Sequence, residues 1–251
     1  MVISTRVSLQ WPPEAPEELS HTMAFTSPGN NYVDVRIFKD KYPYKQTKGA
    51  RIPHFEDVFQ WCLAGEEQPI PNSGKIRFVN HIDTLAISKS LRTGKPLELG
   101  EDVGDFSIIE GSEDRKETGV MVNPDTNKVQ NYVEIWRSLD PIGHTPTSEV
   151  REPKNEIEHI EVYALETVNS DKYLGKVLRL GNWVQGILYD KSNEDVPIHV
   201  IRAFYNLQEK TWESLIEYGN VEWFPFPFQG KLGDVVDIEG SDIQWKCIEH
   251  M

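Results

Sequence analysis

The sequence predicts an all-β protein made of two tandem antiparallel β-barrels. Short segments alternate apolar and polar residues, turn-forming residues separate them at near-regular spacing, and one long polar stretch divides the chain. In the clearest segment, residues 32–38, Val33, Val35 and Ile37 alternate with Asp34 and Arg36, which is the period of a half-buried strand. Many such strands joined by turns are typical of sandwiches and barrels.

The same reasoning, applied along the chain, predicts the remaining elements. Strands are expected at 6–11, 22–26, 32–38, 75–87, 106–110, 119–122, 132–137, 158–166, 176–189, 198–206, 212–218, 235–239 and 243–248. Residues 55–63 and 212–218 fit one face of a helix as well as a strand, and the β-rich surroundings favour strand in both. Residues 88–105, rich in Lys, Gly and Glu, are expected to form a loop that covers a barrel mouth.

A Pro- and Gly-containing stretch at 140–146, followed by charged and polar residues to 158, marks the boundary between two units. We therefore expect an N-terminal barrel domain at residues 1–145 and a C-terminal barrel domain at residues 155–251.

Charge and composition exclude several classes of function. Lys and Arg number 26 against 40 Asp and Glu, a net charge of -14, whereas nucleic acids and anionic membranes need a basic partner surface. No apolar run of 18 residues and no signal-like N-terminus occur, so we expect a cytoplasmic protein without membrane insertion. The two cysteines, Cys62 and Cys247, form no CxxC pair.

The sequence also lacks the common motifs of cofactor-dependent catalysis. There is no GxGxxG, complete phosphate loop, GxSxG or HExxH, and no two histidines stand two or four residues apart. We therefore expect no metal and no other cofactor.

Two residues of the strand predicted at 75–87 are candidate acid–base groups. By alternation, His81 and Asp83 share a face with Val79 and Leu85. If that face lines a cavity, the imidazole and the carboxylate shift each other's pKa, as general acid–base catalysis requires. If the face is solvated, both are ordinary strand residues.

Two aromatic patterns bear on the fold. Gly181-Asn182-Trp183 is typical of the strand start in lipocalin-type (calycin) barrels, where an arginine, here Arg202 or Arg179, stacks on the indole. The alternative is a plain core tryptophan. Residues 222–228 alternate aromatics with prolines, which excludes a central strand and favours packing over a core edge. An exposed ligand for a partner's groove is the other option.

Over residues 7–250 the chain resembles the fungal HRI family, known for a yeast protein that interacts with a casein-kinase-I-type kinase. The matching segments, in the same order and spacing, are 59–65, 82–84, 117–120, 132–141, 181–186 and 240–245. The resemblance implies two successive calycin-like barrels. The family favours an aromatic residue where this chain has His81.

The resemblance implies two classes of function. Yeast-type members resemble non-enzymatic cytosolic interaction proteins, which implies a casein-kinase-I-type kinase as partner. Proteins of similar architecture in fungal secondary metabolism act as hetero-Diels–Alderases that join a tropolone quinone methide to humulene. Such a cofactor-independent pericyclase needs only an aromatic-lined cavity that orients its reactants and one or two polar groups.

The leading prediction is therefore a small-molecule-binding barrel pair that acts as a pericyclase on an apolar substrate. We place the site in the N-terminal barrel, with Trp61 and Trp136 as the substrate-binding wall and His81 and Asp83 as catalytic groups. The alternatives are a non-enzymatic interaction protein and a simple carrier of an apolar ligand.

Overall fold

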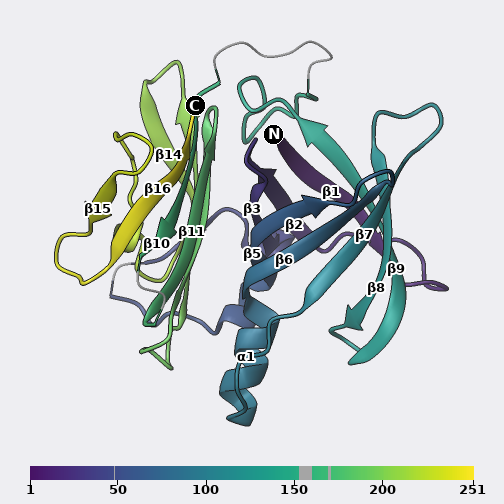
Figure 1. Ribbon diagram of the computed structural model, residues 1–251, viewed down its shortest axis with the longest axis horizontal. Helices are drawn as coiled ribbons and strands as arrows, with labels where there is room; N and C mark the ends of the chain where they lie inside the picture. Colours follow the sequence, from purple (N-terminus) through teal and green to yellow (C-terminus); the bar gives the residue numbers. More distant parts are fainter. Residues whose placement is uncertain (48, 153–159, 169–170) are drawn as a thin grey trace.

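The computed structural model describes residues 1–47, 49–152, 160–168 and 171–251. Its regular structure is almost entirely strand, arranged as a barrel and a second sheet packed side by side (Figure 1). The predicted all-β class with two successive units is confirmed.

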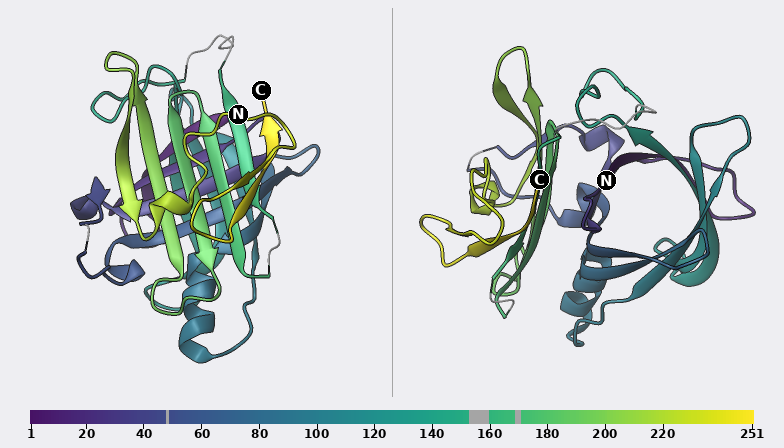
Figure 2. Two further views of the ribbon diagram at one scale, coloured as in Figure 1. Left: turned by 90° about the vertical axis from the view of Figure 1, so that its left-hand side faces the viewer. Right: turned by 45° about the horizontal axis from the view of Figure 1, so that its top comes forward.

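The N-terminal unit is a closed antiparallel barrel in the order β1-β2-β3-β5-β6-β7-β8-β9. Its strands are β1 (Val2–Gln10), β2 (Ser20–Thr26), β3 (Asn31–Phe38), β5 (Phe59–Pro69), β6 (Lys75–Asp83), β7 (Glu101–Ile108), β8 (Arg115–Asn123) and β9 (Lys128–Leu139). The first and last strands close it, pairing from Ile3 with Leu139 to Gln10 with Val133. The right-hand view of Figure 2 shows these strands arranged in a ring.

The second unit is an eight-stranded sheet in the order β15-β16-β10-β11-β12-β13-β14-β4. Its strands are β10 (Val162–Thr167), β11 (Tyr173–Leu180), β12 (Trp183–Asp190), β13 (Ile198–Asn206), β14 (Thr211–Tyr218), β15 (Val235–Asp237), β16 (Gln244–His250) and the short β4 (Tyr44–Lys45). The last of these belongs to the chain between β3 and β5 and pairs in parallel with β14.

Hence part of the segment predicted as the N-terminal domain completes the second sheet. The domain boundary between 145 and 155 stays a prediction, and residues 153–159 lie outside the described ones.

One hydrophobic core joins the two units. The outward side chains of β3, among them Val33 and Val35, are fully buried and share a cluster with Leu178, Ile187 and Val200 of the second sheet. On the sheet's other face, residues 222–228 cover the surface, as the sequence predicted. Both faces of the second sheet are packed, and the cavity described below lies in the barrel.

A helix replaces the end of one predicted strand and the start of a predicted loop. β6 ends at Asp83, and α1 (Thr84–Thr93) follows, where alternation predicted strand to 87 and loop to 105. The Asp83 carboxylate accepts hydrogen bonds from the amides of Leu85 and Ala86, and Gly94 ends the helix with φ 65°. These are ordinary helix-starting and helix-ending signals, which the continued alternation of Leu85 and Ile87 concealed.

The two ambiguous stretches resolve mainly as strands. A 3₁₀ turn, η2 (Phe55–Asp57), precedes β5, and residues 211–218 form β14. Two further 3₁₀ turns are η1 (Lys39–Lys41) and η3 (Val221–Trp223).

The arginines predicted to stack on Trp183 lie over other rings. The Arg202 guanidinium lies 5.7 Å from the Tyr42 ring centroid, and the Arg179 guanidinium lies 5.2 Å from that of Trp212. Trp183 is fully buried and donates its indole hydrogen to the backbone carbonyl of His144. It is a core residue that packs the segment after β9 onto the second sheet.

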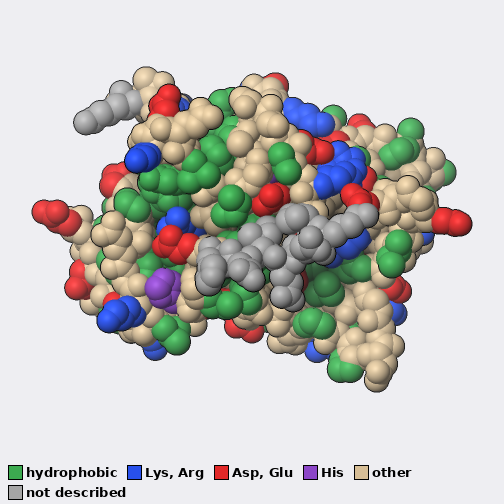
Figure 3. All heavy atoms as spheres, turned by 90° about the horizontal axis from the view of Figure 1, so that it is seen from above, with side chains coloured by type: hydrophobic (Ala, Val, Ile, Leu, Met, Phe, Trp, Pro, Cys, Tyr) green, Lys and Arg blue, Asp and Glu red, His purple; other side chains and the backbone are tan. Residues whose placement is uncertain are grey.

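Acidic and basic side chains are interspersed on the face seen in Figure 3. Among the described residues, no helix has both the length and the apolar character needed to cross a bilayer.

Candidate functional site

The barrel encloses a cavity of about 760 Å³. Because successive side chains of a strand point to opposite faces, β3 directs Tyr32, Asp34 and Arg36 inward and its apolar residues outward. The six aromatic residues of the cavity wall are Tyr32, Trp61, Phe78, Phe106, Tyr132 and Trp136. The interior thus combines large ring surfaces with ionisable groups.

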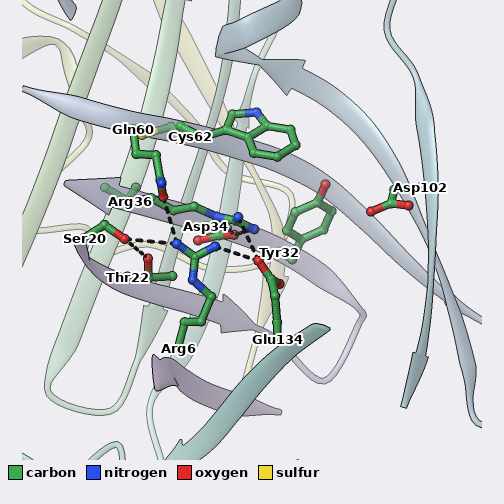
Figure 4. Close-up of polar contacts among 12 residues, drawn as sticks. Arg6, Ser20, Thr22, Tyr32, Asp34, Arg36, Gln60, Cys62, Asp102 and Glu134 are labelled. Atoms are coloured by element: carbon green, nitrogen blue, oxygen red, sulfur yellow. Dashed lines mark hydrogen bonds and ion pairs between the residues drawn. The ribbon is translucent and has the colours of Figure 1, made fainter. Parts of the chain in front are cut away.

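Ion pairs occupy one side of this interior, where β9, β1, β2 and β3 follow one another around the barrel (Figure 4). Arg6 donates to Glu134 at 2.6 Å and to Glu18 at 2.6 Å. Arg36 contacts Glu134 at 3.3 Å and the Oδ2 atom of Asp34 at 2.8 Å. Two arginines therefore converge on Glu134 and fix its carboxylate in the wall.

Glu117 lies in the same cavity and forms no ion pair with any residue that the structure describes. Its Oε1 accepts a hydrogen bond from the Tyr132 hydroxyl at 2.8 Å, and its Oε2 accepts one from the Trp136 indole at 2.8 Å. Burial, together with the negative charges of Glu134 and Asp102, raises the pKa of Glu117 to about 8. The side chain is a carboxylic acid that keeps its proton near neutral pH, and such a group can donate it.

Two glycines make room for this acid and its partner. A Cβ atom on Gly104 of β7 would lie 2.2 Å from the Glu117 Oε1 atom. A Cβ atom on Gly119 of β8 would lie 2.6 Å from the Tyr132 ring. The close approach of both polar groups therefore depends on glycine at these two positions.

Asp83 stands at the cavity end next to α1 and performs two structural tasks. Its Oδ1 caps the helix and accepts a hydrogen bond from the Trp61 indole at 2.9 Å. Burial raises the pKa of this carboxyl group. The predicted residues Trp61, Asp83 and Trp136 all lie in the cavity wall.

His81 does not share the face of Asp83, and that part of the predicted arrangement is wrong. The β5–β6 pairing shifts between Ala64 and Gly65, which face Ile82 and Asn80 respectively. This bulge breaks the alternation, so Asn80 and Asp83 line the cavity and His81 is absent from its lining. Burial, with the positive charge of Lys176 from the second sheet, lowers the pKa of His81.

The sequence reasoning missed Glu117, an acid of the cavity whose pKa burial raises to about 8. Glu117 ends an acidic run at residues 110–117, a composition that by itself indicates a solvated loop or edge, yet the Glu117 residue is only 4% exposed. Alternation does place Glu117 and Gly119 on one face of their strand. It likewise places Tyr132, Glu134 and Trp136 on one face of the next strand, which is the pattern that could have indicated the site. Among the described residues, no group of three or more His, Cys, Asp or Glu is arranged to hold a metal ion.

Comparison with known proteins places the chain in a family. The family model described as Protein HRI1 matches residues 2–249. The chain belongs to the HRI1 family. Similar HRI1 proteins occur in Kluyveromyces lactis, with 23% identity covering 98% of both chains, and in Lachancea thermotolerans, with 23% identity covering 98% of this chain and 91% of the relative.

The fold is shared with a solved structure, that of the uncharacterized protein YLR301w of Saccharomyces cerevisiae. The TM-score is 0.75 at 22% identity, over 100% of this chain and 98% of the other. The predicted HRI-type membership is thus confirmed. The roles of individual site residues, the kinase partner, the absence of cofactors and the cytoplasmic location stay predictions.

Proposed function

We propose that this HRI1 family protein binds a small organic molecule inside its N-terminal barrel. The observation that carries the proposal is the cavity of about 760 Å³, whose wall combines six aromatic rings with buried carboxyl groups. That volume falls within the roughly 300–1,000 Å³ that ligand pockets usually occupy. Rings supply contact area, and a few polar groups orient the ligand.

Native mass spectrometry of the full chain, after exposure to a fungal metabolite extract, tests this proposal. We expect a retained adduct of a few hundred daltons, as roughly fits a cavity of this class. Ala24→Phe, which places a ring in the cavity, should abolish the adduct, whereas Ala50→Phe on an exposed position outside the barrel should not. Absence of any adduct, with a kinase recovered in a pull-down, would favour the non-enzymatic interaction role.

A second candidate function is the cofactor-free cycloaddition of a tropolone quinone methide with a humulene-type sesquiterpene. It is favoured by one observation, the buried carboxyl of Glu117 that accepts the Trp136 indole hydrogen in the cavity and whose pKa burial raises to about 8. An acid placed there would protonate the hydroxyl of a benzylic alcohol, which leaves as water, and the ring hydroxyl would return its proton to the carboxylate as the quinone methide forms. The restored carboxyl could then donate a hydrogen bond to the quinone methide oxygen, while the aromatic walls hold both reactants in contact.

Turnover of these precursors by purified variants tests the second candidate. We expect Glu117→Gln to lower turnover by roughly 10²-fold, the lower range for loss of a general acid. His81→Ala, outside the cavity lining, should leave turnover unchanged. Equal turnover by wild type and Glu117→Gln would show that this acid takes no part in the mechanism. Binding of the precursors without turnover would show that the protein is a carrier.

A further inference from the structure

The arginines of the barrel interior differ in their partners. Arg6 and Arg36 both form ion pairs with Glu134, at 2.6 and 3.3 Å. Arg115, at the start of β8, forms no ion pair with any residue that the structure describes. Its side chain shares the inward face of β8 with Glu117 and lines the cavity. Arg115 therefore brings a positive charge into the wall that no described carboxylate pairs with.

The guanidinium of Arg115 has donors left over. Its Nη2 atom donates to the Ser4 hydroxyl at 3.2 Å. Its Nε atom is buried without a hydrogen-bond partner. Its Nη1 atom also donates to no described residue, and this atom is not buried, so it is open to an acceptor. Because hydrogen bonds from a charged donor are among the stronger ones in proteins, an acceptor placed here would be favourable.

Ser4 supplies a second donor at the same place. It lines the cavity from β1 and is only 4% exposed. Its oxygen accepts the hydrogen bond from Arg115, and its hydroxyl hydrogen has no acceptor among the described residues. The hydroxyl and the guanidinium thus present two unused donors side by side, which suits the two oxygens of a carboxylate.

The neighbouring acids do not fill this place. Glu67 accepts a hydrogen bond from the Thr26 hydroxyl at 2.7 Å instead, and burial raises its pKa, which the charge of Arg115 offsets only in part. Glu117 accepts from the Trp136 indole, and its pKa of about 8 leaves it mainly uncharged at pH 7. Neither acid therefore acts as the counter-ion of Arg115.

A row of aromatic rings begins at this pair of donors. The Arg115 guanidinium lies 5.5 Å from the Phe106 ring centroid. The Phe106 centroid lies 6.4 Å from that of Phe78, which lies 5.7 Å from that of Tyr32. All three rings line the cavity. An apolar body would pack along them with its charged end at the arginine.

We propose that the barrel binds an organic acid in its anionic form, with the carboxylate held by Arg115 and Ser4. The apolar body of the ligand packs along Phe106, Phe78 and Tyr32. This inference rests on the proposed small-molecule binding, and it specifies the class of ligand and the place of its polar end. A ligand without an oxyanion would leave the charge of Arg115 unpaired.

Isothermal titration calorimetry with matched probes tests the inference on the full chain at pH 7. Diphenylacetate is compared with diphenylacetamide, in which an NH₂ group replaces one carboxylate oxygen. We expect the anion to bind at least about tenfold more tightly than the amide. Equal affinities, or tighter binding of the amide, would overturn the inference while small-molecule binding stands.

Variants assign the preference to residues. Arg115→Gln should weaken diphenylacetate by at least about tenfold and leave diphenylacetamide unchanged, which also shows that the variant has folded. Ser4→Ala should weaken the anion by about fivefold and serves as the second test if Arg115→Gln does not fold. Arg77→Gln, the same change of charge on an exposed residue of β6 outside the cavity lining, should alter neither affinity. A preference for the anion that survives Arg115→Gln would overturn the inference, because the carboxylate would then be bound elsewhere.

Native mass spectrometry separates this inference from the proposed function without relying on the two probes. An adduct from the metabolite extract that wild type retains and Arg115→Gln loses would support the inference. An adduct that Arg115→Gln retains in full would overturn it and leave small-molecule binding intact. If neither probe binds and the extract leaves no adduct on wild type, the inference and the proposed function both fail.

Discussion

Replacement of Glu117 by glutamine should change how the stability of the protein depends on pH. A glutamate carboxyl in the unfolded chain ordinarily has a pKa of 4.5, and in the folded barrel burial raises the pKa of Glu117 to about 8. The folded state therefore binds this proton more tightly than the unfolded state does. Its stabilising contribution is complete below pH 4.5 and is lost as the pH rises towards about 8.

The magnitude follows from the two pKa values. Each unit of pKa difference corresponds to about 1.4 kcal/mol, so the free energy of unfolding falls by roughly 5 kcal/mol across this range. Between pH 5 and pH 8 the loss is about 4 kcal/mol. The amide has nearly the same shape and no charge: its oxygen can accept from the Trp136 indole, and its NH₂ group can donate to the Tyr132 hydroxyl. Glu117→Gln should therefore lack this loss.

Urea unfolding at a series of pH values, followed by tryptophan fluorescence, measures the difference. Groups that titrate equally in wild type and variant cancel, so the stability of Glu117→Gln relative to wild type should rise by about 4 kcal/mol from pH 5 to pH 8. Glu209→Gln, with the same charge change on an exposed site, should give a flat difference. A flat difference for Glu117→Gln as well would refute the proton-holding role.

Three other substitutions test the cavity wall, the helix cap beside it and a contact between the two units. Gly104→Ala should push the Glu117 carboxyl away and cost about 1–3 kcal/mol in urea unfolding, whereas Gly100→Ala, with open space around its Cβ, should cost under about 1 kcal/mol. Asp83→Ala should destabilise α1 by about 1 kcal/mol and speed its amide exchange, whereas Asp83→Asn keeps the capping oxygen; equal exchange in both would refute the cap. Glu249→Ala should lower the free energy of unfolding by about 1–3 kcal/mol, because that carboxylate binds the β2–β3 turn of the barrel. Glu249→Gln should retain part of this stabilisation. If Glu249→Ala leaves the free energy of unfolding unchanged, the contact is dispensable.

The fold was more accessible to sequence reasoning than the site. Alternation located barrel strands such as β3, whose cavity-facing residues Asp34 and Arg36 are polar and whose outward residues Val33 and Val35 are apolar. It failed after Asp83, where apolar Leu85 and Ile87 continued the strand period into a helix. The capping side chain and Gly94 would have indicated the change.

The site could be predicted in part, because Trp61, Asp83 and Trp136 do line the cavity. The face of His81 could not be predicted, since a bulge depends on the pairing of two strands and one strand's sequence does not reveal it. Glu117 was hidden for a related reason. An acidic residue in an acidic run indicates a solvated surface. Only closure of the barrel shows that the face of the strand carrying Glu117 is enclosed.

The two-residue strand β4 has a consequence for how the chain can be divided or synthesised. Residues 44–45 leave the barrel between β3 and β5, pair with Ile216 and Glu217 of β14, and the chain then returns. During synthesis these residues emerge long before their partner strand exists. Their pairing must therefore wait until β14 has been synthesised, which makes it a contact between residues far apart in the sequence. A fragment that begins at residue 155 would expose the corresponding edge of β14 as an open template for another chain.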